Sequence, residues 1–333
     1  MTETAVAKPV PIREAYRNRL AALLPDHPRA ICLDTDSGLF TGVDFGTAAD
    51  RYVNIGIAEH NLMGMAAGMA ASGWMPYVNT MAAFATARAI EAIKIDVAYN
   101  DLPVRIMATH GGLSAGHLGP THQCLEDLAV MRALPNMTVV VPADTAATEA
   151  LVDASLDLPG PLYARLGRKA TPSLPQDVPA PVVGLVQPLR AGTDALVAAC
   201  GPYPVLAALE AAETLARQGI AVGVLNVHTL KPLDTEGILA AAAGVPLVVT
   251  VEEHWRAGGL GGAVAETLAE HAPVRVLRVG MPDTFASYVG GHRDLLNHYG
   301  ITGQTVTRAV LHGLAGPPPD TSGSSSRERG RHQ

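Results

Sequence analysis

Residues 54–61 read NIGIAEHN and open the stretch of sequence that decides the fold, which continues to Gln123. The first of these residues have the apolar character of a strand end, and residues 58–72 then follow with no helix breaker except Gly64 and Gly68. Glu59 therefore falls in the first turn of a predicted helix, where the helix dipole stabilises a carboxylate. Such a glutamate is usually only a helix-start residue, but the small residues of this helix predict that something packs unusually close to it.

The far end of this stretch is a buried type of strand that runs into a glycine-rich loop. Residues 103–109 are almost entirely apolar, and His110, His117 and His122 follow within thirteen residues. Ligand sites in parallel sheets lie beyond the carboxyl ends of strands, so this cluster indicates a site. Zinc is disfavoured, because the histidines are seven and five residues apart and Cys124 has no cysteine near it.

Further motifs, in a characteristic order and spacing, carry a resemblance to a known family. The motifs are IAEH at 57–60, Phe84, TH at 109–110, GPTHQ at 119–123, LPNM at 134–137 and VPAD at 141–144. Together they resemble the pyrimidine-binding domain of transketolase. EEH at 252–254 and GGLGG at 258–262 resemble the C-terminal domain of the same family, so the resemblance covers about residues 10–315. The sequence most resembles the split transketolases, in which two polypeptides together correspond to the single chain of other transketolases.

The alternation of predicted strands and helices indicates an α/β fold with two doubly wound domains. Strands are predicted at 30–34, 53–57, 76–80, 103–109, 138–141 and 161–165, and then at 195–199, 221–226, 246–251 and 274–279. A parallel-sheet pyrimidine-binding domain is expected over residues 10–172, a proline-rich linker over 173–190, and a smaller α/β C-terminal domain over 191–315. The composition of residues 316–333 predicts a disordered tail.

Four residues are assigned to the cofactor by the resemblance. It implies that Glu59 hydrogen-bonds the N1′ nitrogen of the aminopyrimidine of thiamine diphosphate, and that Phe84 stacks on that ring. Asp36 matches an acidic residue near the pyrimidine, although a turn-forming aspartate is an equally good interpretation. Met81 and Ala87 stand where the family has two further aromatic residues, which predicts a reshaped pocket.

On the substrate side, the resemblance implies that His110 and His122 are catalytic residues that hold substrate oxygens. Arg165 matches an arginine that binds the sugar phosphate, a task that suits a guanidinium, and a surface arginine is the alternative. His117 and Leu118 occupy the two positions where ordinary transketolases carry a Glu-Asp pair. A leucine cannot accept a hydrogen bond from a 2-hydroxyl group, so an acceptor other than the usual 2-hydroxy sugar phosphates is predicted.

The sequence also lacks a motif that the family needs. Transketolases hold the diphosphate and its Mg²⁺ with a Gly-Asp-Gly turn, and none occurs in these 333 residues. We therefore assign no metal ligand to this chain and expect a diphosphate-binding partner subunit, in a heterotetramer with two copies of each chain. The expected activity is transfer of a two-carbon ketol unit from a ketose donor to an aldehyde acceptor. Two alternatives remain open: a decarboxylative subunit, similar to the pyruvate dehydrogenase beta subunit or deoxyxylulose phosphate synthase, and a non-catalytic partner-binding subunit.

Composition is consistent with a two-domain cytoplasmic protein. The chain has 48% hydrophobic and 17% charged residues, and its formal net charge of −7 argues against a nucleic-acid surface. Three widely separated cysteines, Cys32, Cys124 and Cys200, suggest a reducing compartment. Residues 1–11 lack the apolar core of a signal peptide, and the longest apolar run, 238–251, is too short to span a bilayer.

Overall fold

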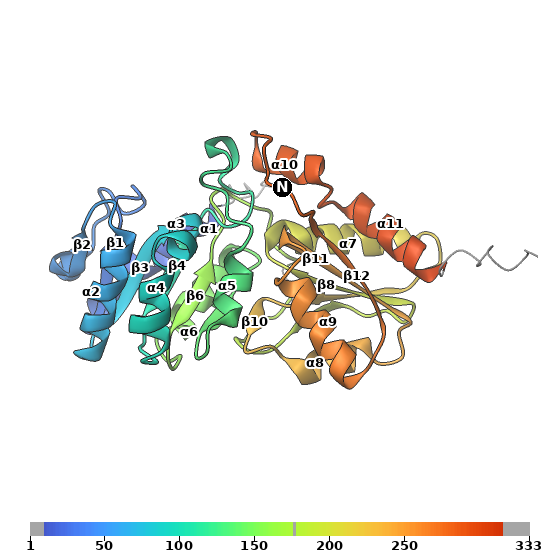
Figure 1. The fold of residues 1–333 in the computed structure, drawn as a ribbon, viewed down its shortest axis with the longest axis horizontal. Helices are drawn as coiled ribbons and strands as arrows, with labels where there is room; N and C mark the ends of the chain where they lie inside the picture. Colours follow the sequence, from blue (N-terminus) through green and yellow to red (C-terminus); the bar gives the residue numbers. More distant parts are fainter. Residues whose placement is uncertain (1–9, 176–177, 316–333) are drawn as a thin grey trace, which may run out of the picture.

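Short apolar strands, several of them buried at every residue, form the first of two sheets in the computed structural model of the chain (Figure 1). The structure describes residues 10–175 and 178–315. The strands of the first sheet are β1 Ala30–Asp34, β2 Tyr52–Asn54, β3 Met75–Met81, β4 Arg105–Thr109, β5 Thr138–Val140 and β6 Leu162–Arg165. They are parallel and lie in the order β5-β6-β4-β3-β1-β2. Burial of both faces explains why these strands are continuous apolar runs in the sequence.

Helices cover both faces of this sheet and form a separate core on each. On one face α1 (Ile12–Leu23) packs against α6 (Thr145–Ala154), which begins where the side chain of Asp144 accepts a hydrogen bond from the Ala147 amide. The other face carries α2 Glu59–Ala71, α3 Ala82–Ala87, α4 Ile90–Ala92, a π-helical turn Ile93–Ala98 and α5 Asp127–Ala133. Shorter 3-10 turns occupy Leu24–Asp26, Gly46–Arg51 and Gly116–Leu118.

The second unit repeats the α/β plan around a smaller sheet. Its strands are β7 Gln187–Arg190, β8 Ala195–Cys200, β9 Val222–Asn226, β11 Leu247–Trp255 and β12 Arg275–Met281, in the order β12-β11-β8-β9-β7. Its helices are α7 Pro202–Ala216, α8 Thr235–Ala242, α9 Leu260–His271, α10 His292–Tyr299 and α11 Gly303–Leu314. The two α/β units expected from the sequence are thus confirmed, and the second has fewer strands within the described residues.

Two edge strands differ from the expectation. β7 is antiparallel to β9 and lies inside residues 173–190, the range expected to be a linker. It contains Pro188, which an edge strand tolerates because one side of such a strand needs no ladder hydrogen bonds. β10 (Thr229–Lys231) comes from the second unit, yet it pairs antiparallel with β5 and extends the first sheet. The first sheet is therefore mostly parallel rather than entirely so, and the two units share a sheet edge.

The parallel strands bring the candidate residues to one edge of the first sheet. Met81 is the last residue of β3, His110 follows β4, Arg165 ends β6 and Glu59 follows β2. The expected disordered tail, residues 316–333, lies outside the described residues. Among the residues that the structure describes, no helix is both long enough and apolar enough to cross a membrane.

Candidate active site

Glu59 is the first residue of α2, as the sequence predicted, but it is not an ordinary exposed helix-start residue. Its side chain is only 5% exposed, and the Glu59 carboxylate lies 3.4 Å from Nη1 of Arg88. Arg88 follows α3 and is half-exposed. A carboxylate is thus held just inside the protein surface, at the positive end of a helix dipole.

The ring of Phe84 lies beside this carboxylate. Arg88 places its guanidinium carbon 4.1 Å from the centroid of the Phe84 ring, and His122 meets the same ring edge-on at a centroid distance of 5.4 Å. Arg88 therefore contacts both Glu59 and Phe84. The structure brings together an acid from α2, an aromatic ring from α3 and an imidazole from the loop after β4, three elements that are distant in the sequence.

His110 lies immediately beyond β4 in a buried position. Its backbone has a left-handed conformation, with φ of 63°, and its Nδ1 atom is 2.9 Å from the hydroxyl of Thr109. Burial, and then the nearby cations of Arg13 and Arg168, lower the pKa of His110 to about 3. The imidazole is therefore neutral around pH 7, so its ring nitrogens can both accept and donate a hydrogen bond.

Arg13 and Arg168 lie near His110, although the sequence analysis did not single them out. Both lie close enough to His110 to lower its pKa, and the buried Nε atom of each has no hydrogen-bond partner within the described residues. Burial and Arg168 likewise lower the pKa of Arg13. Two guanidinium groups thus lie near a neutral imidazole, and positive charge of this kind favours an anion. Arg13 belongs to the first turn of α1, and no sequence motif connects it to the loop after β4.

Arg165 lies at the expected strand end, but its guanidinium is used inside the protein. The side chain is 6% exposed, its Nε atom lies 3.0 Å from Oδ2 of Asp127, and its Nη2 atom donates to the carbonyl of Cys124 at 2.8 Å. The hydroxyl of Tyr163 donates to the same Asp127 oxygen at 2.8 Å. Burial rules out a surface arginine, and phosphate binding by Arg165 stays a prediction.

The remaining candidates lie nearer the surface. Asp36 is exposed, with φ of 56° in a turn, whereas Asp34 is the buried acid of that segment and accepts hydrogen bonds from Thr35 N, Ser37 Oγ and Tyr52. Met81 is partly buried at the end of β3. His117 and Leu118 lie exposed in the turn Gly116–Leu118. In the part of the chain that the structure describes, no three His, Cys, Asp or Glu side chains form a group that could hold a metal ion.

Two protein family models together match most of the chain. The family model described as the transketolase pyrimidine binding domain matches residues 8–173, and the one described as the transketolase C-terminal domain matches residues 184–306. The chain belongs to the transketolase family. The resemblance drawn from the sequence motifs is therefore confirmed for both the pyrimidine-binding and the C-terminal domain.

Its relatives include single subunits of multi-chain transketolases. The chain is 36% identical over 302 residues to one subunit of the apulose-4-phosphate transketolase of Phocaeicola vulgatus, with 90% of this chain and 96% of the relative covered. It is 37% identical over 301 residues to a 6-deoxy-6-sulfo-D-fructose transketolase subunit of Clostridium sp., with 90% and 93% covered. A solved structure described as a split gene transketolase, inactive beta4 tetramer, matches with a TM-score of 0.83 and 41% identity, over 92% of this chain and 99% of that chain.

Proposed function

We propose that this chain is the pyrimidine-side subunit of a two-chain transketolase. With a separate diphosphate-binding subunit, it transfers a two-carbon ketol unit from a ketose donor to an aldehyde acceptor. The observation that carries this proposal is the buried carboxylate of Glu59 beside the ring of Phe84. The names of its relatives, which are subunits of transketolases, support the same division of the enzyme between chains.

The residues present fit the aminopyrimidine half of thiamine diphosphate. A flat heterocycle needs an aromatic face to stack on and a carboxylate to share a proton with a ring nitrogen, and Phe84 and Glu59 offer both. Met81 borders this place at the start of α3, and Asp36 supplies a secondary polar contact. When bound, thiamine diphosphate supplies the electron sink for carbon–carbon bond cleavage.

Each residue of the chain has a distinct task in this proposal. Glu59 holds the proton at N1′ of the pyrimidine and so sets the protonation state of that ring. Arg88 lies over the Phe84 ring in this structure, so an aromatic ligand stacks there only after Arg88 moves. Arg88 also faces the Glu59 carboxylate, so the same movement uncovers this acid.

The substrate groups are assigned from the loop after β4. His110 and His122 hold substrate oxygens as catalytic residues, and the neutral state of His110 allows it to donate a hydrogen bond without adding charge. Arg165 binds the substrate phosphate, and Arg168 and Arg13, whose cations lie near His110, support the same anion. Leu118 is 40% exposed at the rim and His117 is next to it, so we propose an acceptor that lacks the usual 2-hydroxyl interaction. We further propose a heterotetramer whose Mg²⁺ ligands are on the partner subunit.

Calorimetry with the two subunits tests this proposal. The chain, the partner and their mixture are each titrated with thiamine diphosphate and Mg²⁺, and only the mixture is expected to bind tightly and transfer ketol units. Tight binding by this chain alone would contradict the divided site. Release of carbon dioxide from a pyruvate-type donor would instead favour a decarboxylative enzyme, and binding without turnover would favour a non-catalytic subunit.

A further inference from the structure

The loop that carries the proposed substrate histidines is closed at its base. Gly112 and Cys124 form an antiparallel bridge, with Gly112 N donating to Cys124 O at 2.8 Å and Cys124 N donating to Gly112 O at 3.0 Å. His110 precedes this bridge, and His122 lies just inside it. A small shift at the bridge therefore moves both histidines together.

The second unit touches this base through three successive residues of β11. The Leu113 amide donates to Oε1 of Glu253 at 2.5 Å. The Ala129 amide points at Nε2 of His254 at 3.3 Å, and the Trp255 amide donates to Leu125 O at 3.0 Å. Of these three contacts, only the one made by Glu253 reaches the loop between the two histidines.

The Glu253 carboxylate is built into the base of the loop. A Cβ atom at Gly112 would lie 2.4 Å from Oε1 of Glu253, and Gly112 has φ of 63°, so only glycine fits there. Nε2 of His292 lies 2.8 Å from the same Glu253 oxygen. Burial alone would raise the pKa of Glu253, but His292, Arg165 and the Leu113 amide together lower it, so Glu253 stays ionised.

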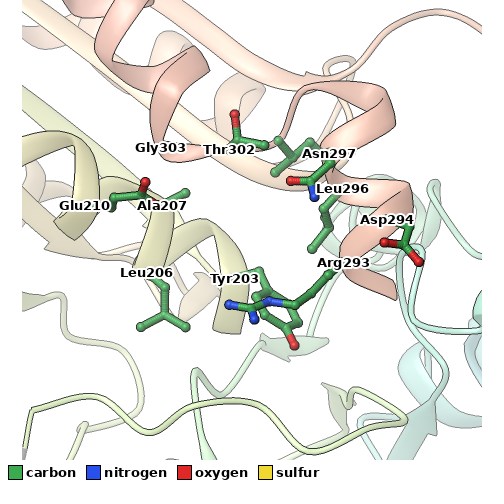
Figure 2. Close-up of a pocket in the computed structure, with 11 residues that line it drawn as sticks. Tyr203, Leu206, Ala207, Glu210, Arg293, Asp294, Leu296, Asn297, Thr302 and Gly303 are labelled. Carbon is green, nitrogen blue, oxygen red and sulfur yellow. The ribbon is translucent and has the colours of Figure 1, made fainter. Parts of the chain in front are cut away.

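The ring of His292 also packs against an aromatic residue of α7. Its ring meets Tyr203 edge-on at a centroid distance of 4.9 Å, and the guanidinium carbon of Arg293 lies 5.7 Å from the centroid of the Tyr203 ring. Tyr203 forms part of the wall of a hollow of about 440 Å³ between α7 and the α10–α11 segment (Figure 2). The Glu253–His292 pair therefore bridges the packing of the second unit and the loop of the first.

We propose that Glu253, supported by His292, is a positioning residue that fixes the loop presenting His110 and His122 to the substrate. This inference rests on the proposed function, because it assigns the second unit a task in the same reaction. Under this proposal the C-terminal domain is not only architectural. It sets the geometry of substrate binding, while the place proposed for the cofactor ring, beside Glu59 and Phe84, is formed without it.

The test compares Glu253→Ala and Glu253→Gln with the matched control Glu252→Gln, each in complex with the partner subunit. Glu252 is the preceding buried carboxylate of β11, but its side chain contacts the start of α9 and not the loop. Glu253→Ala should lower kcat/KM for the acceptor about tenfold or more, mainly through KM, because a hydrogen bond to a buried charge is lost. Glu253→Gln retains an oxygen that can accept from Leu113 N and should recover part of this loss.

Amide hydrogen exchange gives a readout that needs no substrate. In Glu253→Ala, exchange across residues 111–123 should accelerate about tenfold or more, while β4 stays protected and thiamine diphosphate affinity is unchanged. Unchanged exchange together with acceptor kcat/KM within twofold of wild type would overturn the proposal. Equal losses in Glu252→Gln would also overturn it, because they would reflect general destabilisation. A wild-type complex without ketol transfer would refute the proposed function alone, since the exchange measurement would still report on the loop.

Discussion

Both units place a carboxylate at the start of a helix beside a mostly parallel sheet, but they use it in different ways. Glu59, at the start of α2, faces the half-exposed Arg88 across 3.4 Å. Glu252 of β11 is fully buried and accepts from Leu260 N at 2.7 Å and Gly261 N at 2.8 Å, which are the first amides of α9. The carboxylate at the helix start of the first unit is thus covered by a half-exposed side chain, whereas that of the second is held by backbone amides of its own chain.

This difference explains the glycines at 258–262, which resemble a nucleotide-binding loop in the sequence. A Cβ atom at Gly259 would lie 2.0 Å from Oε2 of Glu252, so this glycine makes room for a carboxylate of the same chain. The amides that would otherwise bind a phosphate are already paired. A glycine-rich helix start is therefore a binding site only when no side chain of the protein occupies it.

The largest difference in turnover is expected between substitutions of Glu59 and of Glu252. Glu59→Gln should raise the barrier for turnover by several kcal/mol, a loss of a thousandfold or more, because it removes a group that acts only in the chemistry. Glu252→Gln should change the free energy of unfolding and leave turnover per folded complex close to wild type. Steady-state rates and proton exchange at C2 of bound thiamine diphosphate measure both. Unchanged exchange in Glu59→Gln would remove Glu59 from its assigned task.

The arginine that ends β6, Arg165, and the one three residues later, Arg168, should also differ in the effect of substitution. Arg165→Met should lower the free energy of unfolding by about 3–5 kcal/mol, since it leaves Asp127 buried without its cation. Arg168→Met should leave the stability near wild type and raise KM for a phosphorylated substrate by about 10–100-fold. Denaturant unfolding and kinetics with phosphorylated and unphosphorylated acceptors distinguish these outcomes. If Arg168→Met affects both acceptors equally, Arg168 does not bind the phosphate.

The two units can also be compared through the pH dependence of stability, because each contains a buried histidine. Burial and the cations near His110 lower its pKa to about 3, and burial lowers the pKa of His254 in the second unit. Below about pH 6.5 the unfolded chain binds protons that the folded chain does not, so stability falls as pH drops from 6.5.

His110→Gln should therefore reduce the loss of unfolding free energy between pH 7 and pH 5 by about 2 kcal/mol. His254→Gln should act in the same direction on stability, but only His110→Gln should also impair substrate turnover. Urea titrations at several pH values, with His60→Gln on the surface of α2 as a control, measure the slopes. Equal slopes in wild type and His110→Gln would contradict a neutral buried His110.

The smallest effect on activity is expected for Leu118, an exposed residue in the loop between His110 and His122. Leu118→Asp should improve kcat/KM for ribose 5-phosphate over its 2-deoxy analogue by about five- to tenfold, because an aspartate can accept a hydrogen bond from the 2-hydroxyl. Leu118→Met, which has a similar size and cannot accept this hydrogen bond in the same way, is the matched control. A strong preference of the wild type for ribose 5-phosphate would show that Leu118 does not set acceptor choice.

Part of this architecture could be predicted because burial leaves a clear mark in the sequence. The strand expected at 30–34 is found as β1, and that expected at 103–109 as β4, since strands covered on both faces are unbroken apolar runs. β10 could not be found in this way. It has only three residues, and its place is determined by the exposed edge of β5 rather than by its own pattern.

For the candidate site too, some residues could be predicted from local sequence, whereas others come together only in the folded chain. Glu59 and Phe84 could be found because each lies in a short motif at a strand or helix end. Arg165 and Arg168 look alike in the sequence, and what separates them is Asp127, which only the fold brings beside Arg165. Arg13 lies almost a hundred residues before His110, so only the fold shows that the two residues are near each other.

The pairing of β10 with β5 also bears on how the protein is made. On the ribosome, β5 and β6 emerge well before β10, so the first sheet stays open at one edge until much of the second unit has been synthesised. An uncovered edge strand is a template for pairing with other chains. A gene break between β6 and β7 would make that exposure permanent, because the strand that covers β5 would then belong to a different polypeptide.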